Sequence, residues 1–335
     1  MVNSSVTIIV IVLCLTILNF MVWDKTSNEK KPAMAKFYEM LITKRENETS
    51  VEESLVKIQE KLDDEWRYLE RIDAKLESYD SLFAVQQHGI ADSKQQMFQK
   101  MKEQSIKQAP LRKRTLGQIF KPNQFAELYG SLAPEVICPE KIRIGTIGDG
   151  GKWTCNPWKV PQDSIMLSFG LNNFIGFEQN WQIMLSNRSI IYGFDADEQK
   201  NSTKEVLAGV RAQTKEALIG PVSKPENGTY TMMDLTKELN IEKVEILKID
   251  IEGAEKTCLV PFLEKYQVCQ IYMELHGGSE EHIKLLQGIA HLNYRLFSYE
   301  VNGFEMRACE YSLIHESCIE KYGAKPIANY LDFSN

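Results

Sequence analysis

Apolar residues follow three different spacings along the chain, and each spacing predicts a different kind of structure. The first is an uncharged run from Val6 to Trp23, VTIIVIVLCLTILNFMVW. A helix needs about 20 mainly apolar residues to cross a bilayer, and this run is close to that length. A cleavable signal peptide would have a basic leader and a small-residue cleavage site, and neither is evident here. We therefore expect residues 1–23 to form an uncleaved transmembrane signal anchor.

In the second pattern, apolar residues alternate three and four positions apart within a segment rich in Lys and Glu. They are Leu55, Ile58, Leu62, Leu69, Ile72, Leu76, Tyr79 and Phe83. Such spacing keeps one side of a helix facing a partner, which is typical of a coiled coil. A single amphipathic helix lying on the rest of the chain would give the same pattern. We expect residues 24–110 to form a helical stalk that self-associates through residues 55–83.

The third pattern begins near Leu111, where short apolar runs bounded by turn residues alternate with helical patterns. We expect strands at 164–169, 189–194, 217–222, 244–250, 268–275, 294–299 and 310–315. We expect helices at 175–186, 198–214, 253–266 and 279–291. Nearly continuous apolar strands that alternate with helices predict an α/β fold, with a mostly parallel sheet covered on both faces. Residues 111–335 are long enough to fold as one domain.

Charge and cysteine content narrow the class of protein. The net charge of −7 and the pI of about 5.5 give no electrostatic support for nucleic-acid binding, so we expect no nucleic-acid partner. Of the 7 cysteines, one lies in the apolar run and an even number remains, which suits disulfides but also an ordinary cytosolic enzyme.

Two signals disagree about which side of the membrane carries the body of the chain. Lysines follow the apolar run and none precedes it, which favours the cytosol. Glycosylation sequons favour the lumen, and they stand at Asn47, Asn187, Asn201 and Asn227. We expect a single-pass protein of the Golgi or endoplasmic reticulum with a luminal C-terminal domain.

Candidate ligand-binding residues follow the first two predicted strands of this domain. Ligands of open parallel sheets bind outside the carboxyl ends of the strands. Gly170, in the segment SFGLNN, permits close approach of the backbone to a ligand. Asp195, in GFDAD, is placed to accept hydrogen bonds from a ribose diol. The alternative for Asp195 is that it caps the following helix. Capping is the role we expect for Asp197, the second aspartate of GFDAD.

Acidic residues and a histidine follow the next two strands. In LKIDIEGAE, residues 247–255, strand alternation puts Asp250 and Glu252 on one face at the carboxyl end. In IYMELHGG, Glu274 and His276 share one face at a corresponding depth. These side chains can do general acid–base work or hold a divalent cation. We assign them to catalysis and assign no metal site.

A glycine-rich loop precedes these strands. The segment RIGTIGDGGKWTCNP, residues 143–157, has too many glycines for a helix or an ordinary strand, so 148–151 predicts a loop folded against a ligand. The GK[ST] ending of a phosphate-binding loop is missing, which argues against a nucleoside triphosphatase.

Together these motifs resemble the FkbM family of methyltransferases, in particular its animal methyltransferase-like branch. LKIDIEGAE is the most specific match; SFGLNN, YGFDAD, MMDL and YMELH match more weakly, and the resemblance covers roughly residues 112–335. It implies a seven-stranded, Rossmann-like methyltransferase sheet, S-adenosylmethionine as cofactor and methyl transfer to a hydroxyl oxygen. The cofactor-binding residues that it implies are Phe169, Gly170, Asn172, Asp195 and Asp234. Asp250 is the candidate base. Asn172 and Asn173 stand where many such enzymes have a Gly-x-Gly run.

The expected acceptor is a hydroxyl of a glycan or a lipid, because the enzyme is tethered to a membrane. A luminal glycosyltransferase is the main alternative, with Asp195 and Asp197 as an Asp-X-Asp motif for a metal and a sugar nucleotide. A catalytically inactive membrane tether is the other.

Overall fold

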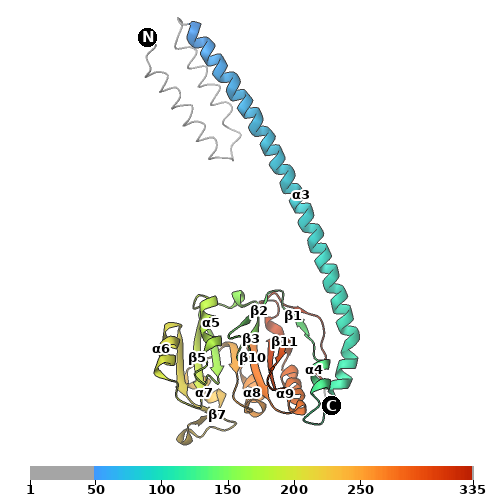
Figure 1. The fold of residues 1–335 in the computed structure, drawn as a ribbon, viewed down its shortest axis with the longest axis vertical. Coiled ribbons are helices and arrows are strands. Elements are labelled where there is room, and N and C mark those ends of the chain that lie inside the picture. The colour runs from blue at the N-terminus through green and yellow to red at the C-terminus, as the bar shows by residue number, and fades with distance from the viewer. Residues whose placement is uncertain (1–48, 334–335) are drawn as a thin grey trace. The chain divides into compact units, whose positions relative to one another are not determined.

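The computed structural model describes residues 49–333, with side chains described for 56–80 and 92–333 (Figure 1). The chain divides into two compact units, residues 1–91 and 92–335. The expected anchor, Val6 to Trp23, lies outside the described residues. Among the residues that are described, no helix combines the length and apolar character that membrane crossing requires.

One long helix, α3, runs from Thr49 to Leu116. It contains the expected heptad segment, so the prediction of a helix there is confirmed, whereas self-association stays a prediction. Several apolar residues of the seam are exposed in the single chain, among them Leu69 at 43%, Leu76 at 46% and Tyr79 at 68%.

The last turns of α3 belong to the second unit and pack onto it. Leu116 is fully buried, and Arg112 Nη1 donates a hydrogen bond to the Ser131 carbonyl at 2.7 Å. Nearer the start of this unit, Lys325 Nζ lies 5.1 Å from the centre of the Phe98 ring. The end of α3 is therefore anchored to the sheet domain by both polar and apolar contacts.

A seven-stranded sheet forms the centre of the second unit, in the order β11-β12-β10-β9-β4-β5-β6. Its strands are β4 (Ser164–Phe169), β5 (Ser189–Asp195), β6 (Ala212–Glu216), β9 (Val244–Ile249), β10 (Val268–His276), β11 (Tyr294–Val301) and β12 (Ala308–His315). Only β12 runs antiparallel to its neighbours. Numbered along the chain, the order is 6-7-5-4-1-2-3, so it reverses between β4 and β9, where open sheets bind ligands. The expected seven-stranded, mostly parallel sheet is confirmed.

Shorter elements surround this sheet. The helices are α4 (Phe125–Ser131), α5 (Gly176–Met184), α6 (Asn201–Gly209), α7 (Met232–Glu238), α8 (Glu255–Lys265) and α9 (Ser279–His291). Three small two-stranded sheets pair β1 (Val136–Ile137) with β13 (Lys325–Pro326), β2 (Lys141–Ile144) with β3 (Lys152–Cys155), and β7 (Leu218–Ile219) with β8 (Thr229–Tyr230). Short 3-10 turns are η1 (Pro157–Lys159), η2 (Pro225–Asn227) and η3 (Glu316–Cys318).

The strand expected at 217–222 is present only as the two-residue β7, which pairs with β8 outside the central sheet. The third parallel strand is instead β6, with the polar sequence AQTKE. The helix expected at 198–214 is shorter than predicted, since α6 ends at Gly209 and β6 begins at Ala212. β6 lies at the edge of the sheet, beside β5 only. An edge strand is half exposed and need not carry an apolar run, so the pattern that located the central strands missed it.

The two faces of the sheet have separate cores. On one face, Leu247 and Met273 pack with α7, α8 and α9 in a mainly apolar layer. On the other face, Ile246 and Tyr272 pack with α5, α6 and the β2–β3 hairpin. This second layer becomes polar toward the carboxyl ends of the strands, where Ser168, Lys248 and Glu274 are buried.

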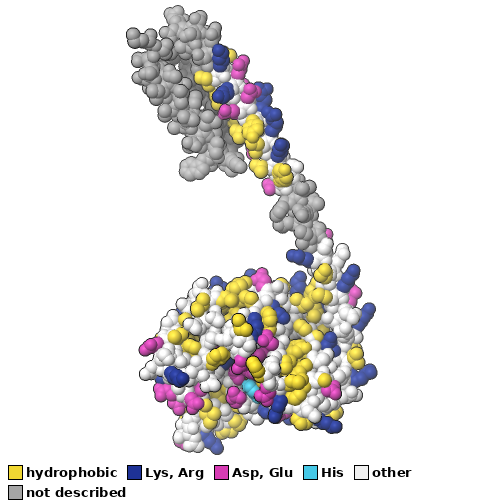
Figure 2. Space-filling view, in the orientation of Figure 1, with side chains coloured by type: hydrophobic (Ala, Val, Ile, Leu, Met, Phe, Trp, Pro, Cys, Tyr) yellow, Lys and Arg dark blue, Asp and Glu magenta, His cyan; other side chains and the backbone are white. Residues whose placement is uncertain are grey.

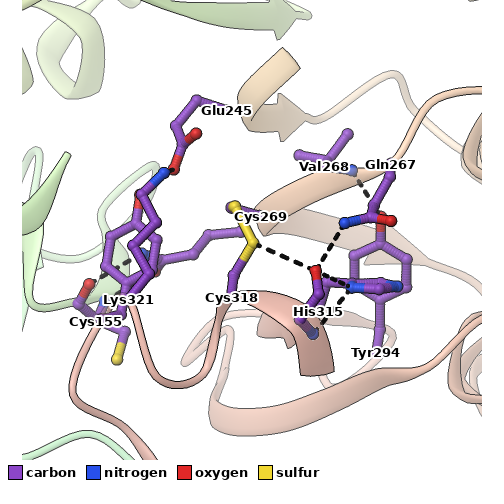
Figure 3. The surroundings of a disulfide bond; sticks show 12 residues. Cys155, Glu245, Gln267, Val268, Cys269, Tyr294, His315, Cys318 and Lys321 are labelled. Atoms are coloured by element: carbon purple, nitrogen blue, oxygen red, sulfur yellow. Dashed lines mark hydrogen bonds and ion pairs between the residues drawn. A yellow bond between two sulfur atoms is a disulfide. The ribbon is translucent and has the colours of Figure 1, made fainter. Parts of the chain in front are cut away.

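Two disulfides lie on the side of the hairpin and η3. Cys138–Cys155 closes the base of the β2–β3 hairpin, and Cys269–Cys318 joins the start of β10 to η3 (Figure 3). Near the second bridge, Lys321 forms an ion pair with Glu245 of β9. Cys258 and Cys309 are free and buried. The first bridge fixes the hairpin whose far end carries the glycine-rich loop.

Candidate active site

Four carboxylates stand at the same level on four neighbouring strands. In the antiparallel register, Glu274 of β10 lies opposite Glu310 of β12, and Glu310 lies opposite Glu300 of β11. Asp250 directly follows Ile249, the residue level with Met273, so it stands beside Glu274. Residues level with one another on adjacent strands point to the same face, so the carboxyl edge carries a row of acids there. Figure 2 shows acidic side chains gathered beside a histidine on the face in view.

Two basic side chains of the β2–β3 hairpin balance part of this row. Arg143 donates two hydrogen bonds of 3.0 Å to Glu300, which also accepts one of 2.7 Å from the Trp153 indole. Lys152 is fully buried, 2.5 Å from Glu310 Oε1 and 3.9 Å from Glu274 Oε2. Glu300 therefore has its own cation, whereas Glu274 and Glu310 share one.

Lys152 does not keep the pKa values of Glu274 and Glu310 in their usual range. Burial raises the pKa of Glu310 to about 8, against the lowering effect of Lys152. Burial also raises the pKa of Glu274, and the nearby charges of Asp250 and Asp149 raise it further. Like charges held close together in a poorly solvated place disfavour their joint ionisation, so this edge of the sheet retains protons that exposed carboxyls would release.

The four predicted catalytic residues do converge. One ligand atom each of Asp250, Glu252 and His276 lies within 4.8 Å of the other two. His276 Nε2 is 3.8 Å from Glu252 Oε2 and 3.8 Å from Glu274 Oε1. The convergence that we expected at this crevice is confirmed, and the roles of the residues stay predictions.

The backbone places Glu252 differently from the expected strand alternation. β9 ends at Ile249, and Glu252 lies in the following loop with a left-handed φ of 55°. Its side chain is 84% exposed, whereas Asp250 and His276 are half-buried. The turn, not the pleat of a strand, directs Glu252 toward His276.

Glu255 holds this loop, and the sequence reasoning missed it. Its carboxylate accepts hydrogen bonds from the backbone N–H of Ile251 at 2.6 Å and of Gly253 at 2.8 Å. Glu255, the last residue of LKIDIEGAE and the first residue of α8, therefore holds the loop that precedes its own helix. An acid in the first turn of the helix after a glycine was the available signal.

Gly170 occupies a position that no side chain could share. Its φ is +82°, and a Cβ built there would lie 1.6 Å from the carbonyl oxygen of Asp250. The loop after β4 thus touches the loop after β9. Lys248 supports the same contact by donating a hydrogen bond to the Gly170 carbonyl. The close approach at this glycine is between two loops of the chain itself, and the approach of a ligand expected there stays a prediction.

Asp195 is bound to the first loop. Its Oδ2 accepts hydrogen bonds from the N–H groups of Leu171 at 2.7 Å and Asn172 at 2.6 Å, and its Oδ1 accepts one from Asp197 at 2.9 Å. The side chain is buried, so it organises the loop that follows β4. This arrangement also argues against an Asp-X-Asp metal motif, because Asp195 points to backbone amides instead of joining Asp197 around an ion.

The asparagines that replace the usual glycines keep a glycine-like backbone. Asn172 and Asn173 have φ of 45° and 57°, in the left-handed region that Asn tolerates better than most residues. Asn173 Oδ1 also accepts a hydrogen bond from Lys200 N at 2.7 Å, just before α6. The two asparagines therefore adopt backbone conformations that glycine would also adopt, and Asn173 ties the loop to the start of α6.

Asp234 lies in the first turn of α7 and helps to cap it. Its Oδ2 accepts hydrogen bonds from Ser223 at 2.5 Å and Thr231 at 2.8 Å, and these bonds hold the pKa of Asp234 below its usual value, with Ser223 having the larger effect. The structure brings Asp234 to no other predicted site residue.

The glycine-rich loop is folded by Arg143. The guanidinium donates hydrogen bonds to the carbonyls of Thr146 at 2.5 Å and Gly148 at 2.6 Å. A Cβ at Gly151 would lie 2.1 Å from Arg143 Nη1, which explains a glycine there. The loop brings Asp149 to Glu274 and Glu310, and no sequence pattern indicated the latter contact.

The fold and this carboxylate-lined edge define an α/β enzyme domain of the methyltransferase class. The methyltransferase-domain family matches residues 49–315, from the first residue of α3 to the last residue of β12. The chain belongs to this family and is an enzyme. The matched region begins at residue 49, whereas the resemblance to the FkbM family begins near residue 112.

No curated protein matches the chain. Among solved structures, M. capricolum TrmK in complex with S-adenosylhomocysteine has 10% identity and a TM-score of 0.31, over 48% of this chain and 66% of TrmK. Aeropyrum pernix fibrillarin with bound S-adenosylmethionine has 12% identity and a TM-score of 0.34, over 53% of this chain and 84% of fibrillarin. Human methyltransferase 10 domain containing protein has 11% identity and a TM-score of 0.28, over 50% and 73%. At such low similarity these likenesses indicate neither a cofactor nor a substrate for this chain.

Proposed function

We propose that this chain is a membrane-anchored, S-adenosylmethionine-dependent O-methyltransferase of the FkbM type, acting on a hydroxyl of a glycan or lipid-linked acceptor. Membership of the methyltransferase-domain family and the strand order support the reaction class. LKIDIEGAE supports the FkbM assignment. The observation that carries the proposal is the row of carboxylates beside the reversal of strand order, where Asp250 and Gly170 meet.

The residues at this edge fit the proposed cofactor. When bound, S-adenosylmethionine supplies an activated methyl group on a positively charged sulfonium. Acidic side chains close to Gly170 suit that charge. We propose that Phe169, Gly170 and Asn172 hold the cofactor. Asp195 shapes their loop, and its contact with the ribose is part of the proposal.

Asp250 is the proposed general base. It is half-buried and follows β9 directly, so its backbone is fixed by the hydrogen bond from its N–H to the Phe169 carbonyl at 3.0 Å. It would take the proton of the acceptor hydroxyl as the new bond to oxygen forms. Glu252, Glu274 and His276 line the same crevice and would orient the acceptor.

Exposed apolar side chains near the acids support an acceptor with an apolar part. Ile147 is fully exposed in the loop that carries Asp149, and Phe304 is 95% exposed in the β11–β12 loop. The β11–β12 loop also contacts the row of carboxylates, because Asn302 Nδ2 is 3.5 Å from Glu274 Oε1. Phe174, in the loop after β4, is 53% exposed. A lipid-linked acceptor would cover apolar surface that water otherwise contacts.

The test combines cofactor binding with methyl transfer by the full chain. We expect S-adenosylmethionine to bind in calorimetry, and tritium from its methyl group to enter glycan or lipid fractions of membrane extracts. Asp250→Asn should retain binding and lose at least about a hundredfold in transfer. Glu320→Gln, a change of an exposed carboxylate beyond η3, should alter neither. A folded chain that does not bind S-adenosylmethionine, or an Asp250→Asn variant of full activity, would contradict the proposal.

A luminal location is supported by the disulfides and by two exposed sequons. Disulfides persist mainly in oxidising compartments, and the described chain has two. Asn201 and Asn227 are exposed, as glycan attachment requires. Endoglycosidase treatment of the protein from secretory cells should increase its mobility, and Asn201→Gln with Asn227→Gln should reduce that shift. An unchanged mobility would argue for a cytosolic body.

We also propose that α3 pairs with a second copy of the chain. The partly exposed seam at Leu69, Leu76 and Tyr79 repeats every seven or three residues, as a coiled-coil interface does. Sedimentation velocity should show a dimer that Leu69→Asp with Leu76→Asp converts to a monomer. A wild-type monomer at micromolar concentration would contradict this.

A further inference from the structure

A second cluster of ligand atoms lies beside Asp250, Glu252 and His276. One carboxylate oxygen each of Asp149, Glu274 and Glu310 lies within 4.8 Å of the other two. Asp149 comes from the glycine-rich loop before β3, whereas Glu274 and Glu310 face each other across β10 and β12. Three separate segments therefore bring oxygen donors to one point.

One oxygen of this cluster is buried and has no partner. Glu310 is 7% exposed; its Oε1 accepts the hydrogen bond from Lys152, and its Oε2 has no hydrogen-bond partner among the described residues. A buried carboxylate oxygen left without a donor or a cation is costly, and such groups in folded proteins are normally satisfied. This oxygen belongs to the residue that pairs with Lys152 and that lies beside the other two acids.

Few cations stand among these acids. The charges of Asp149 and Asp250 act on Glu274, that of Asp250 also acts on Glu310, and Lys152 acts on both glutamates. Arg143 is engaged with Glu300 instead. One ammonium group serves both glutamates, so a further positive charge beside them would be favourable.

We propose that Asp149, Glu274 and Glu310 bind one divalent metal ion of the Mg²⁺ or Mn²⁺ class. A donor set made only of carboxylate oxygens suits these hard cations. Lys152 stays on Glu310 Oε1 and orients the carboxylate, so that Oε2 is the oxygen that meets the ion. Asp149 is exposed and gives the ion a route from solvent.

An ion at this point would have two consequences. It would fix the glycine-rich loop to the sheet through Asp149, and it would place a positive charge in the carboxylate row that also contains Asp250. An acceptor oxygen bound there would lose its proton more readily. The site itself depends neither on the methyl donor nor on the acceptor, so it can be tested without methyl transfer.

The experiment uses the full chain after removal of metals with a chelator. Manganese is the probe, and free Mn²⁺ is measured by electron paramagnetic resonance during a titration. We expect one saturable site, and we expect Asp149→Asn and Glu310→Gln each to weaken binding more than about tenfold. Glu320→Gln changes an exposed carboxylate outside the cluster and should bind as the wild type does.

Two outcomes would overturn the proposal. They are absence of saturable Mn²⁺ binding by the folded wild type, and binding that both cluster variants retain at full strength. Glu310 is buried and its change could disturb folding, but Asp149 is exposed, so Asp149→Asn gives a result in either case. Calorimetry with S-adenosylmethionine on the same samples separates the two proposals. Binding of S-adenosylmethionine without binding of Mn²⁺ would contradict only the metal site. Binding of Mn²⁺ without binding of S-adenosylmethionine would contradict only the proposed function.

Discussion

The two faces of the central sheet differ in the kinds of side chain that they bury. The face under α7, α8 and α9 is buried by apolar side chains such as Leu259, Phe262 and Leu286. The face under α5 and the β2–β3 hairpin buries charged groups as well, including Lys152 and Glu310. One face stabilises the fold by removing apolar surface from water, and the other keeps acids close together at some cost in stability.

The difference follows from the elements that pack on each face. Helices α7, α8 and α9 pack on the apolar face together with a few residues of β7 and the C-terminal segment, and helices bury a broad apolar stripe well. A hairpin covers β10, β11 and β12 on the other face, and its ends are held by the Cys138–Cys155 bridge. The hairpin brings Arg143, Lys152 and Asp149 to the carboxyl edge of the sheet. Strained and charged features of this kind concentrate where a protein does chemistry.

The largest effect should come from the apolar face. Phe262 in α8 is 1% exposed, and Phe262→Ala should lower the free energy of unfolding by about 3–5 kcal/mol because it leaves a cavity. Urea denaturation followed by circular dichroism measures this loss. The folded fraction should bind S-adenosylmethionine as tightly as the wild type does, and a clear loss of affinity would show that the faces are not separate.

The next effect tests the buried charges of the other face. Lys152→Met should lower the free energy of unfolding by about 3 kcal/mol, because it removes the cation that Glu274 and Glu310 share. Adding Glu310→Gln should restore much of that loss, since it removes one of the charges left behind. Denaturation of both single variants and the double variant gives the coupling energy. A double variant no more stable than Lys152→Met would contradict this account.

A somewhat smaller effect concerns the hairpin. Cys138→Ser with Cys155→Ser removes a bridge between residues 17 apart in sequence and should cost about 2–3 kcal/mol. The loop that carries Asp149 should then exchange its amide hydrogens faster, whereas α8 should not. Equal loss of protection in both places would mean that the bridge supports the whole fold and not the hairpin.

The last effect concerns pH and lies at the edge of the apolar face. Burial lowers the pKa of His282 to about 4, while its ring bonds Tyr311 Oη at 2.8 Å. The unfolded chain therefore binds more protons than the folded chain below pH 6.5, so stability should fall as pH drops from 6.5 toward 4. His282→Gln should reduce this slope in denaturation measured across that range.

Most of the fold and part of the site followed from the sequence. The central strands carry apolar runs, so β4, β9 and β10 appeared within a residue or so of their bounds, whereas the polar edge strand β6 did not. Asp250, Glu252, Glu274 and His276 were found because they follow parallel strands, whose carboxyl ends meet at one edge. Lys152 and Glu310 were missed because their places depend on a hairpin and on antiparallel register, which no local pattern gives.

The most direct test of the difference between the two faces is hydrogen exchange of the full chain with and without S-adenosylmethionine. We expect slower exchange at 168–174, 194–199 and 248–254, the loops at the carboxyl ends of β4, β5 and β9, and no change in α8 and α9. Glu320→Gln should give the same pattern. Saturating cofactor that leaves those loops unchanged, or that protects the helices of the apolar face instead, would contradict the placement of the active site on the acidic face.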